Sequence, residues 1–168
     1  LDRVIINAGV AKGAPIGTGR YDANRQTAMT NFVAALAQSE AAMEIFRAQK
    51  RGHLVMISSV ASMRGMRKTV TTYAATKAGV AALAEGLRNE MLGEPDLDIR
   101  VSTIYPGYIR SEMNERVTKT PFIVDTETGV RAMVDAMEKE KANALVPAWP
   151  WVPLGKAMRH LPLPLVRR

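Results

Sequence analysis

The sequence predicts an α/β fold in which helices wind around one parallel β-sheet. Short apolar runs at residues 1–7, 53–58 and 98–105 are typical of buried strands. Longer alanine-rich runs at residues 22–49 and 71–92 have the periodicity of helices and separate the strands. Because strands and helices alternate along the chain, we expect parallel strands joined by right-handed crossovers, as in a doubly wound sheet.

In the first part of the chain we expect one strand followed by one long helix. The strand covers residues 1–7, and the helix begins near Asp22 and ends near Gln49. Side chains at three- and four-residue steps should form its core or interface face, namely Phe32, Leu36, Ser39, Met43 and Phe46. The positive charges and the glycine of Lys50-Arg51-Gly52 favour the end of this helix.

The second part repeats the alternation. A strand at residues 53–58, a helix at 71–92 and a strand at 98–105 are predicted, with Gly93 and Pro95 between the last two. A mobile loop with a short helix at residues 107–121 would cover a substrate, and a helix at 126–140 and a last strand at 144–147 follow. One face of the helix at 126–140 is predicted to hold Val130, Met133, Val134 and Met137.

The composition fits one globular domain or part of one. The chain has 168 residues, of which 47% are hydrophobic. There is no cysteine, which excludes disulfides, zinc–thiolate sites and thiol nucleophiles, and the two histidines are far apart, so no metal site is expected. No apolar run reaches the length of a membrane span, and Asp2 and Arg3 interrupt any signal peptide, so we expect a cytoplasmic protein.

Positive charge is unevenly distributed along the chain. The net charge is +7, and residues 45–84 hold no acid but seven basic residues: Arg47, Lys50, Arg51, Arg64, Arg67, Lys68 and Lys77. Two interpretations stay open: a basic lip that suits a phosphorylated cofactor or an acyl-carrier-type partner, or a solvated basic face. Nucleic-acid binding is not expected, because no recognition motif or aromatic interleaving accompanies the charge.

Residues 149–168 differ in composition from residues 1–148, and we treat them as a separate tail. The tail, WPWVPLGKAMRHLPLPLVRR, combines proline, tryptophan and leucine with basic residues and contains no acid. Tryptophan with lysine and arginine suits peripheral contact with a membrane surface. We favour packing over the substrate pocket or across a dimer.

Ser59, Tyr73 and Lys77 are the strongest candidates for chemistry. Tyr73 and Lys77 are four residues apart in a predicted helix, so their side chains project from one face. A cation beside a tyrosine favours the phenolate and lowers the pKa of the hydroxyl toward the range useful for proton transfer. Ser59 follows the apolar strand, so its hydroxyl should emerge at the carboxyl end of the sheet, where open α/β sheets bind ligands.

Together with other segments, these residues resemble the short-chain dehydrogenase/reductase family. Asn7-Ala8-Gly9 looks like the NAG element of that family, and Asn31 matches the asparagine of its tetrad. Ser59, Tyr73 and Lys77 match its serine and its Tyr-x-x-x-Lys. Pro106-Gly107-Tyr108-Ile109-Arg110-Ser111 looks like its PG-x-V-x-T segment, with Ser111 in place of the usual threonine.

The resemblance implies a Rossmann-like fold and NAD(P)-dependent interconversion of a ketone and a secondary alcohol. It implies Tyr73 as the general acid/base, Ser59 as the group that polarises the carbonyl oxygen, Lys77 on the cofactor ribose, and Asn31 holding a water behind Lys77. The cofactor, NAD or NADP, would contact Asn7, Ala8, Gly9, Tyr73, Lys77, Pro106, Gly107, Ile109 and Ser111. A dimer or tetramer is implied through the helices that carry Asn31 and Tyr73.

The substrate is less well defined by the sequence. Met63, Met66, Tyr108 and Met113 suggest a pocket with apolar walls, and hence an apolar carbonyl compound or alcohol. The alternative function is a non-catalytic interaction module related to such reductases.

The chain departs from the family pattern in two places. The interval from Ser59 to Tyr73 is fourteen positions, slightly longer than usual, so we expect a small insertion at residues 67–69. The opening strand and glycine-rich turn of the family have no counterpart ahead of Leu1. We therefore expect this chain to represent the C-terminal, catalytic half, and to bind NAD(H) or NADP(H) weakly or not at all by itself.

A glycine-rich stretch at residues 13–19 fits a G-x3-G-x-G spacing, but we interpret it as a surface loop. Pro15 lies inside it, and Glu40, the acid nearest the required distance, falls in the middle of a predicted helix rather than at the end of a second strand.

Overall fold

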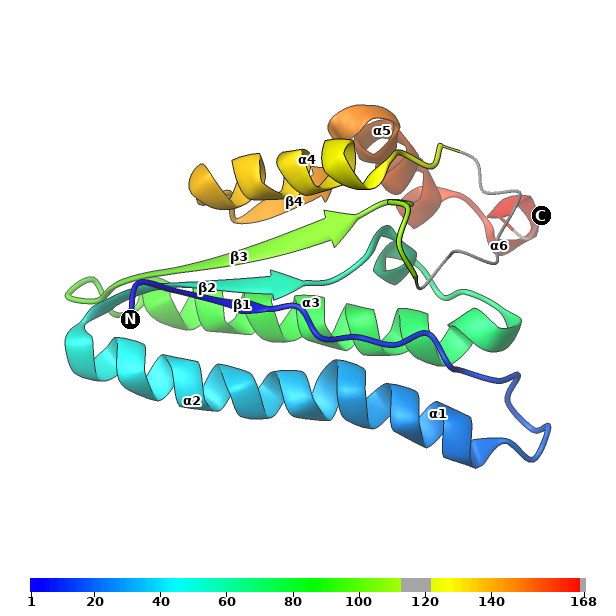
Figure 1. Ribbon diagram of the computed structural model, residues 1–168, viewed down its shortest axis with the longest axis horizontal. Helices are drawn as coiled ribbons and strands as arrows, with labels where there is room; N and C mark the ends of the chain where they lie inside the picture. Colours follow the sequence, from blue (N-terminus) through cyan, green and yellow to red (C-terminus); the bar gives the residue numbers. More distant parts are fainter. Residues whose placement is uncertain (113–121, 167–168) are drawn as a thin grey trace.

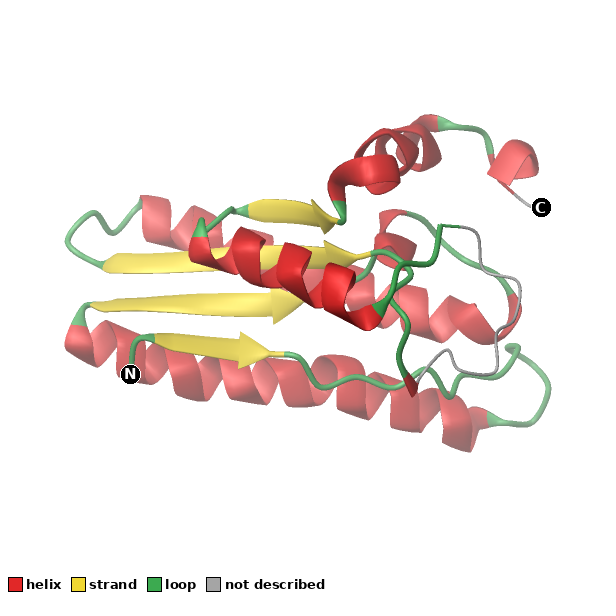
Figure 2. Cartoon of the chain, turned by 45° about the horizontal axis from the view of Figure 1, so that its top comes forward, coloured by secondary structure: helices red, strands yellow, loops and turns green. Residues whose placement is uncertain are grey.

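The computed structural model describes residues 1–112 and 122–166, and it contains one parallel four-stranded sheet. The strands are β1 (Arg3–Ile6), β2 (Arg51–Ile57), β3 (Asp98–Pro106) and β4 (Asn143–Val146), in the order β1-β2-β3-β4. All four arrowheads point to the same end of the molecule (Figure 2). The predicted parallel α/β fold is confirmed.

Helices cover both faces of the sheet (Figure 1). On one face lie α1 (Tyr21–Ala28), the π-helical turn η1 (Met29–Val33), α2 (Ala34–Gln49) and α3 (Thr71–Leu92). On the other face lies α4 (Thr126–Glu138), and α5 (Ala148–His160) and α6 (Leu163–Val166) follow β4. Two short 3-10 turns, η2 (Val60–Met63) and η3 (Lys68–Val70), join β2 to α3.

The central strand β2 explains why the sheet needs both helical layers. Leu54 and Met56 pack with buried side chains of α2 and α3, whereas Val55 and Ile57 pack with buried side chains of α4. Successive residues of a strand point to opposite faces, so the continuous apolar run at residues 54–57 has to be covered on both sides.

Only part of the predicted apolar face of α4 is buried. Val130 and Val134 are exposed, whereas Gly129 and Met137 are buried, with Met133 partly buried. The cause lies in the segment that packs against the helix. A Cβ at Gly129 would come within 2.4 Å of the Ile109 side chain, so the helix approaches this segment through its smallest residue.

Strand β1 lies at one edge of the sheet. It pairs with β2 and, among the described strands, with no other. Its residue Ile5, on the α4 side of the sheet, is 47% exposed, although the sequence predicted a buried strand here.

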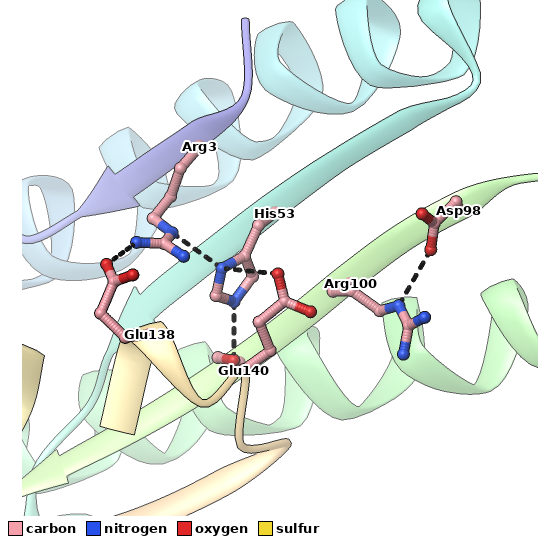
Figure 3. A network of polar contacts seen from close by, with 7 residues as sticks. Arg3, His53, Asp98, Arg100, Glu138 and Glu140 are labelled. Atoms are coloured by element: carbon pink, nitrogen blue, oxygen red, sulfur yellow. Dashed lines mark hydrogen bonds and ion pairs between the residues drawn. The ribbon is translucent and has the colours of Figure 1, made fainter. Parts of the chain in front are cut away.

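A polar network lies at the amino-terminal end of the sheet (Figure 3). The buried ring of His53 accepts a hydrogen bond at Nδ1 from Arg3 Nε at 2.9 Å, so its proton is on Nε2, which donates to Ser102 Oγ at 2.8 Å. Arg3 also binds Glu138, and a Glu140 carboxylate oxygen lies 4.0 Å from His53 Nδ1. Burial, together with the charge of Arg3, lowers the pKa of His53 below its usual value.

Neither a bilayer-crossing helix nor a metal cluster is found within residues 1–112 and 122–166. No helix there combines the length and apolar character that a membrane span requires, and no three His, Asp or Glu side chains are grouped as metal ligands.

Candidate active site

The predicted site residues converge at the carboxyl-terminal end of the sheet. The segments that follow β1, β2 and β3 all leave the sheet at this end, and the first turns of α3 lie beside them (Figure 1). This is the edge at which open parallel sheets bind their ligands.

Lys77 is a buried cation at the centre of the site. Its side chain is 4% exposed, and Nζ donates a hydrogen bond to the carbonyl of Ile57, the last residue of β2, at 2.8 Å. No carboxylate in the described residues forms an ion pair with it. Desolvation therefore lowers the pKa of Lys77 from 10.5 to about 8.

Tyr73 and Ser59 lie close enough for their side chains to interact. Burial has the largest effect on the pKa of Tyr73 and raises it, the interaction with the Ser59 side chain lowers it, and the neighbouring Tyr108 raises it to a smaller extent. Ser59 is buried, and its Oγ also accepts a hydrogen bond from the backbone N–H of Ala61 at 3.1 Å, which caps the turn η2.

The expected direction of the Tyr73 pKa was wrong. We expected Lys77 to lower it, but the pKa of Tyr73 is raised above 10.0, mainly because burial disfavours the phenolate. Lys77 is not among the groups that shift this pKa, and its ammonium group binds the Ile57 carbonyl. Tyr73 is therefore a protonated hydroxyl at neutral pH.

Ser58, the neighbour of Ser59, forms hydrogen bonds that join β2 to α3. Its hydroxyl donates to the backbone carbonyl of Lys77 at 2.7 Å and contacts Ser62 Oγ at 3.1 Å. These contacts tie the end of β2 to α3. Of the two serines, only Ser59 interacts with the Tyr73 side chain.

Asn31 is completely buried and joins two segments of the site. Its Oδ1 accepts from the Val10 N–H at 2.7 Å, and its Nδ2 donates to the Val10 carbonyl at 2.9 Å and to Thr76 Oγ1 at 3.2 Å. Thr76 in turn donates to the Tyr73 carbonyl at 2.7 Å. Asn31 lies within the π-helical turn η1, a type of irregularity that is frequent at functional sites. The sequence signalled neither this turn nor the part played by Thr76.

The residues that follow β1 differ in their placement. Gly9 lies close to Lys77 and Asn31. A Cβ at Gly9 would lie 3.2 Å from Lys77 Nζ and 3.5 Å from Asn31 Oδ1. Asn7 and Ala8 are exposed. Gly9 thus presents bare backbone beside the buried ammonium group.

The segment that follows β3 is held by hydrogen bonds on both sides. Gly107 donates its N–H to the Val146 carbonyl of β4 at 2.8 Å. Val124 donates its N–H to the Tyr108 carbonyl at 3.0 Å and accepts from the Arg110 N–H at 2.9 Å. Ser111 is exposed. Met113 and residues 114–121 of the expected loop lie outside the described residues.

The two loop predictions have structural counterparts. The turn η3, with Lys68 at φ 59°, occupies the place of the expected insertion. The glycine-rich stretch packs against this turn, because a Cβ at Gly13 would come within 2.4 Å of the Thr69 carbonyl oxygen. Asn24 Oδ1 accepts from the Ala14 N–H at 3.0 Å, so this loop is anchored to helix α1.

Comparison with known proteins agrees with this geometry. A sequence model of the short chain dehydrogenase family matches residues 1–121. The chain belongs to this family. An uncharacterized oxidoreductase of Mycobacterium tuberculosis strain H37Rv is 49% identical over 168 residues, which are 100% of this chain and 65% of that relative. An uncharacterized oxidoreductase of Myxococcus xanthus is 31% identical over 98% of this chain and 64% of its own length. The chain therefore spans about two thirds of the length of these two relatives.

A solved short-chain dehydrogenase has the same fold over most of this chain. The enzyme from Burkholderia cenocepacia J2315, in complex with NADP, aligns with a TM-score of 0.80 over 95% of this chain and 66% of that chain, at 21% identity. The predicted family and its Rossmann-like fold are both confirmed.

Proposed function

We propose that this chain carries the catalytic residues of an NAD(P)-dependent oxidoreductase that interconverts a ketone and a secondary alcohol, with Tyr73 as general acid/base. One observation carries the proposal: the side chains of Tyr73 and Ser59 lie close enough to interact, and Lys77, one helical turn after Tyr73 in α3, is a buried cation. Structures of short-chain dehydrogenases in complex with NADP support the choice of cofactor.

The residues present fit the nicotinamide–ribose part of such a cofactor. The Lys77 ammonium group has three N–H groups, and the Ile57 carbonyl takes one of them, so it can donate to ribose hydroxyls. Gly9 has no side chain to block this approach. Contacts from Asn7, Ala8, Tyr73, Pro106, Gly107, Ile109 and Ser111 are part of the proposal. When bound, the cofactor supplies the hydride.

The side chains would then handle the oxygen and its proton. Ser59 would hold and polarise the substrate carbonyl oxygen, as in a small oxyanion site. Tyr73 would give its hydroxyl proton to this oxygen during reduction and take it back during oxidation. The raised pKa of Tyr73 means that the hydroxyl is protonated at neutral pH, so the proton to be donated is present. Asn31 would hold a water behind Lys77 that returns the proton.

The test is the substitution Tyr73→Phe in the protein of full natural length. Oxidation of NADH and of NADPH would be followed spectrophotometrically against a panel of apolar and polar carbonyl compounds. We expect turnover to fall about 10²- to 10⁴-fold, the usual range for the loss of a general acid. Binding of reduced cofactor should change little. Substantial residual turnover in the variant would refute the assigned role.

The non-catalytic interaction module is the competing function. A module of this kind has no need for a buried, uncompensated ammonium group, whereas an oxidoreductase does. Absence of turnover with every carbonyl compound and both cofactors, in a protein that binds neither cofactor, would favour the module.

Oligomerisation through the helices that carry Asn31 and Tyr73 is part of the proposal. Met29, Val33 and Leu36 are exposed and form a stripe on η1 and α2, and Leu36 belongs to the face that we expected to be core or interface. Light scattering should therefore show a dimer or tetramer, which Val33→Glu would dissociate. We also propose a cytoplasmic location. Membrane contact of the tail is not included, because its buried Trp151 packs against the site.

A further inference from the structure

The two tryptophans of the tail have opposite environments. Trp151 is 3% exposed, whereas Trp149, two residues earlier in α5, is 78% exposed. Within the described part of the chain, the indole Nε1 of Trp151 is the buried side-chain polar atom without a hydrogen-bond partner. An orphaned buried N–H costs free energy, so an apolar ring would serve simple packing better at this position.

The indole ring of Trp151 lies directly over Gly107. A Cβ on Gly107 would fall 1.9 Å from Nε1, 2.3 Å from Cε2 and 2.4 Å from Cδ1 of this ring. Real side-chain atoms never approach so closely, so glycine is required at residue 107 while the indole is in place. Gly107 belongs to the segment that we propose lies near the nicotinamide.

The same ring contacts the other parts of the site. Its centroid lies 5.5 Å from that of Tyr108 and 6.3 Å from that of Phe122, both in edge-on geometry. It also belongs to an apolar cluster with Val60, the residue after Ser59. Trp151 therefore separates the Ser59 turn from the segment that follows β3.

Helix α5, which carries Trp151, is fixed at its far end as well. Arg64 Nη1, just after η2, donates to the Met158 carbonyl at 2.8 Å and also to the Leu161 carbonyl. Helix α5 is therefore attached at two points to the segment that follows Ser59: Trp151 packs with Val60, and Arg64 binds the end of the helix. A rigid ring on an anchored helix defines the distance between the two segments that it contacts.

We propose that Trp151 is a positioning residue that holds the segment 106–111 at the correct distance from Ser59 for cofactor binding. This inference rests on the proposed function. It assigns a task to the tail, which lies beyond the residues matched by the family model. The indole acts as a spacer through Gly107, and it does not itself react.

The experiment compares Trp151→Leu with Trp149→Leu in the protein of full natural length. The two substitutions are chemically identical and differ in the burial of the residue replaced. Binding of NADH and NADPH would be measured by nicotinamide fluorescence, well below the melting temperature of each variant. We expect the dissociation constant of Trp151→Leu to rise about tenfold or more, equivalent to about 1.4 kcal/mol, and that of Trp149→Leu to change less than about twofold.

A second readout does not depend on the cofactor. Hydrogen–deuterium exchange should become faster in Trp151→Leu for peptides spanning residues 107–110, where the Arg110 N–H is bonded to Val124. Exchange in α3 should stay unchanged. A folded Trp151→Leu protein with wild-type exchange at 107–110 and wild-type cofactor affinity would overturn the proposal.

A third variant changes Gly107, the other residue of the Trp151–Gly107 contact. It tests the proposal even if Trp151→Leu does not fold. Gly107→Ala alone should weaken cofactor binding, because its Cβ displaces the indole. In a Trp151→Phe background the smaller ring leaves room, so the same substitution should have a smaller effect. Equal effects in both backgrounds would contradict the spacer role. If the wild-type protein binds neither cofactor, the proposed function fails, while exchange at 107–110 still tests the spacer.

Discussion

Lys77 gives a quantitative test of the electrostatics of the site. Its pKa in the folded protein is about 8, against 10.5 when solvated, because the ammonium group is desolvated. The folded state therefore binds this proton more weakly than the unfolded state does. Below a pH of about 8 the burial of the charge lowers the free energy of unfolding by about 3 kcal/mol.

The perturbation is Lys77→Met, which keeps the length of the side chain and removes the charge. It also removes the hydrogen bond to the Ile57 carbonyl, and an unpaired buried carbonyl costs about 1–3 kcal/mol. At neutral pH these two effects offset each other, so the variant should be as stable as the wild type or up to about 2 kcal/mol more stable.

The pH dependence separates the two effects. As the pH rises from about 7 to about 10, Lys77 loses its proton in the folded wild type but largely keeps it in the unfolded chain. The wild type should therefore gain about 2–3 kcal/mol of stability relative to Lys77→Met over this interval. The free-energy cost of the lost hydrogen bond in Lys77→Met is the same at every pH, so it does not contribute to the change in relative stability between the two pH values.

The assay is urea unfolding followed by circular dichroism at a series of pH values. Lys12→Met, at an exposed position, is the control and should show the wild-type pH dependence. If Lys77→Met and the wild type change in parallel between about pH 7 and about pH 10, then Lys77 titrates as a solvated lysine and the desolvation argument fails.

Two further substitutions test contacts outside the reacting groups. The lowered pKa of buried His53 means that its contribution to stability is complete above a pH of about 6.5 and is lost as the pH falls below that value, because the unfolded chain then binds the proton more tightly. His53→Gln should therefore make urea midpoints less sensitive to acid, and an unchanged sensitivity would exclude this assignment. Asn31→Ala leaves the Val10 N–H and carbonyl unpaired in the interior, so thermal unfolding should show a loss of about 2–4 kcal/mol. A loss below about 0.5 kcal/mol would show that water replaces the amide.

The elements that depend on local sequence were predictable. Helix α3 begins at Thr71 and ends at Leu92, the bounds expected from its alanine-rich run. The four strands were each located within about two residues, because short apolar runs between helices have few other interpretations. The alternation also predicted where the candidate catalytic residues lie. Ser59 follows strand β2, and Tyr73 and Lys77 lie in the next helix, α3.

Features that depend on contacts between distant residues were not predictable. Gly52 was expected to end a helix, but it lies in β2, where a Cβ would come within 2.2 Å of the Phe46 ring, and Lys50 adopts the left-handed conformation at the helix end with φ 60°. Burial is the main reason why the pKa of Tyr73 is raised, and the burial of a side chain depends on the whole fold rather than on its neighbours in sequence. The contact of Trp151 with Gly107 joins residues that are far apart in the sequence.

The open side of β1 matters for anyone who produces this chain by itself. Its outer backbone groups and the exposed Ile5 offer a template onto which another extended segment can hydrogen-bond. Concentrated samples should therefore aggregate by strand addition unless some other polypeptide shields this border. A lysine in place of Ile5 would be the simplest protection, because burying its charge between two stacked chains is unfavourable.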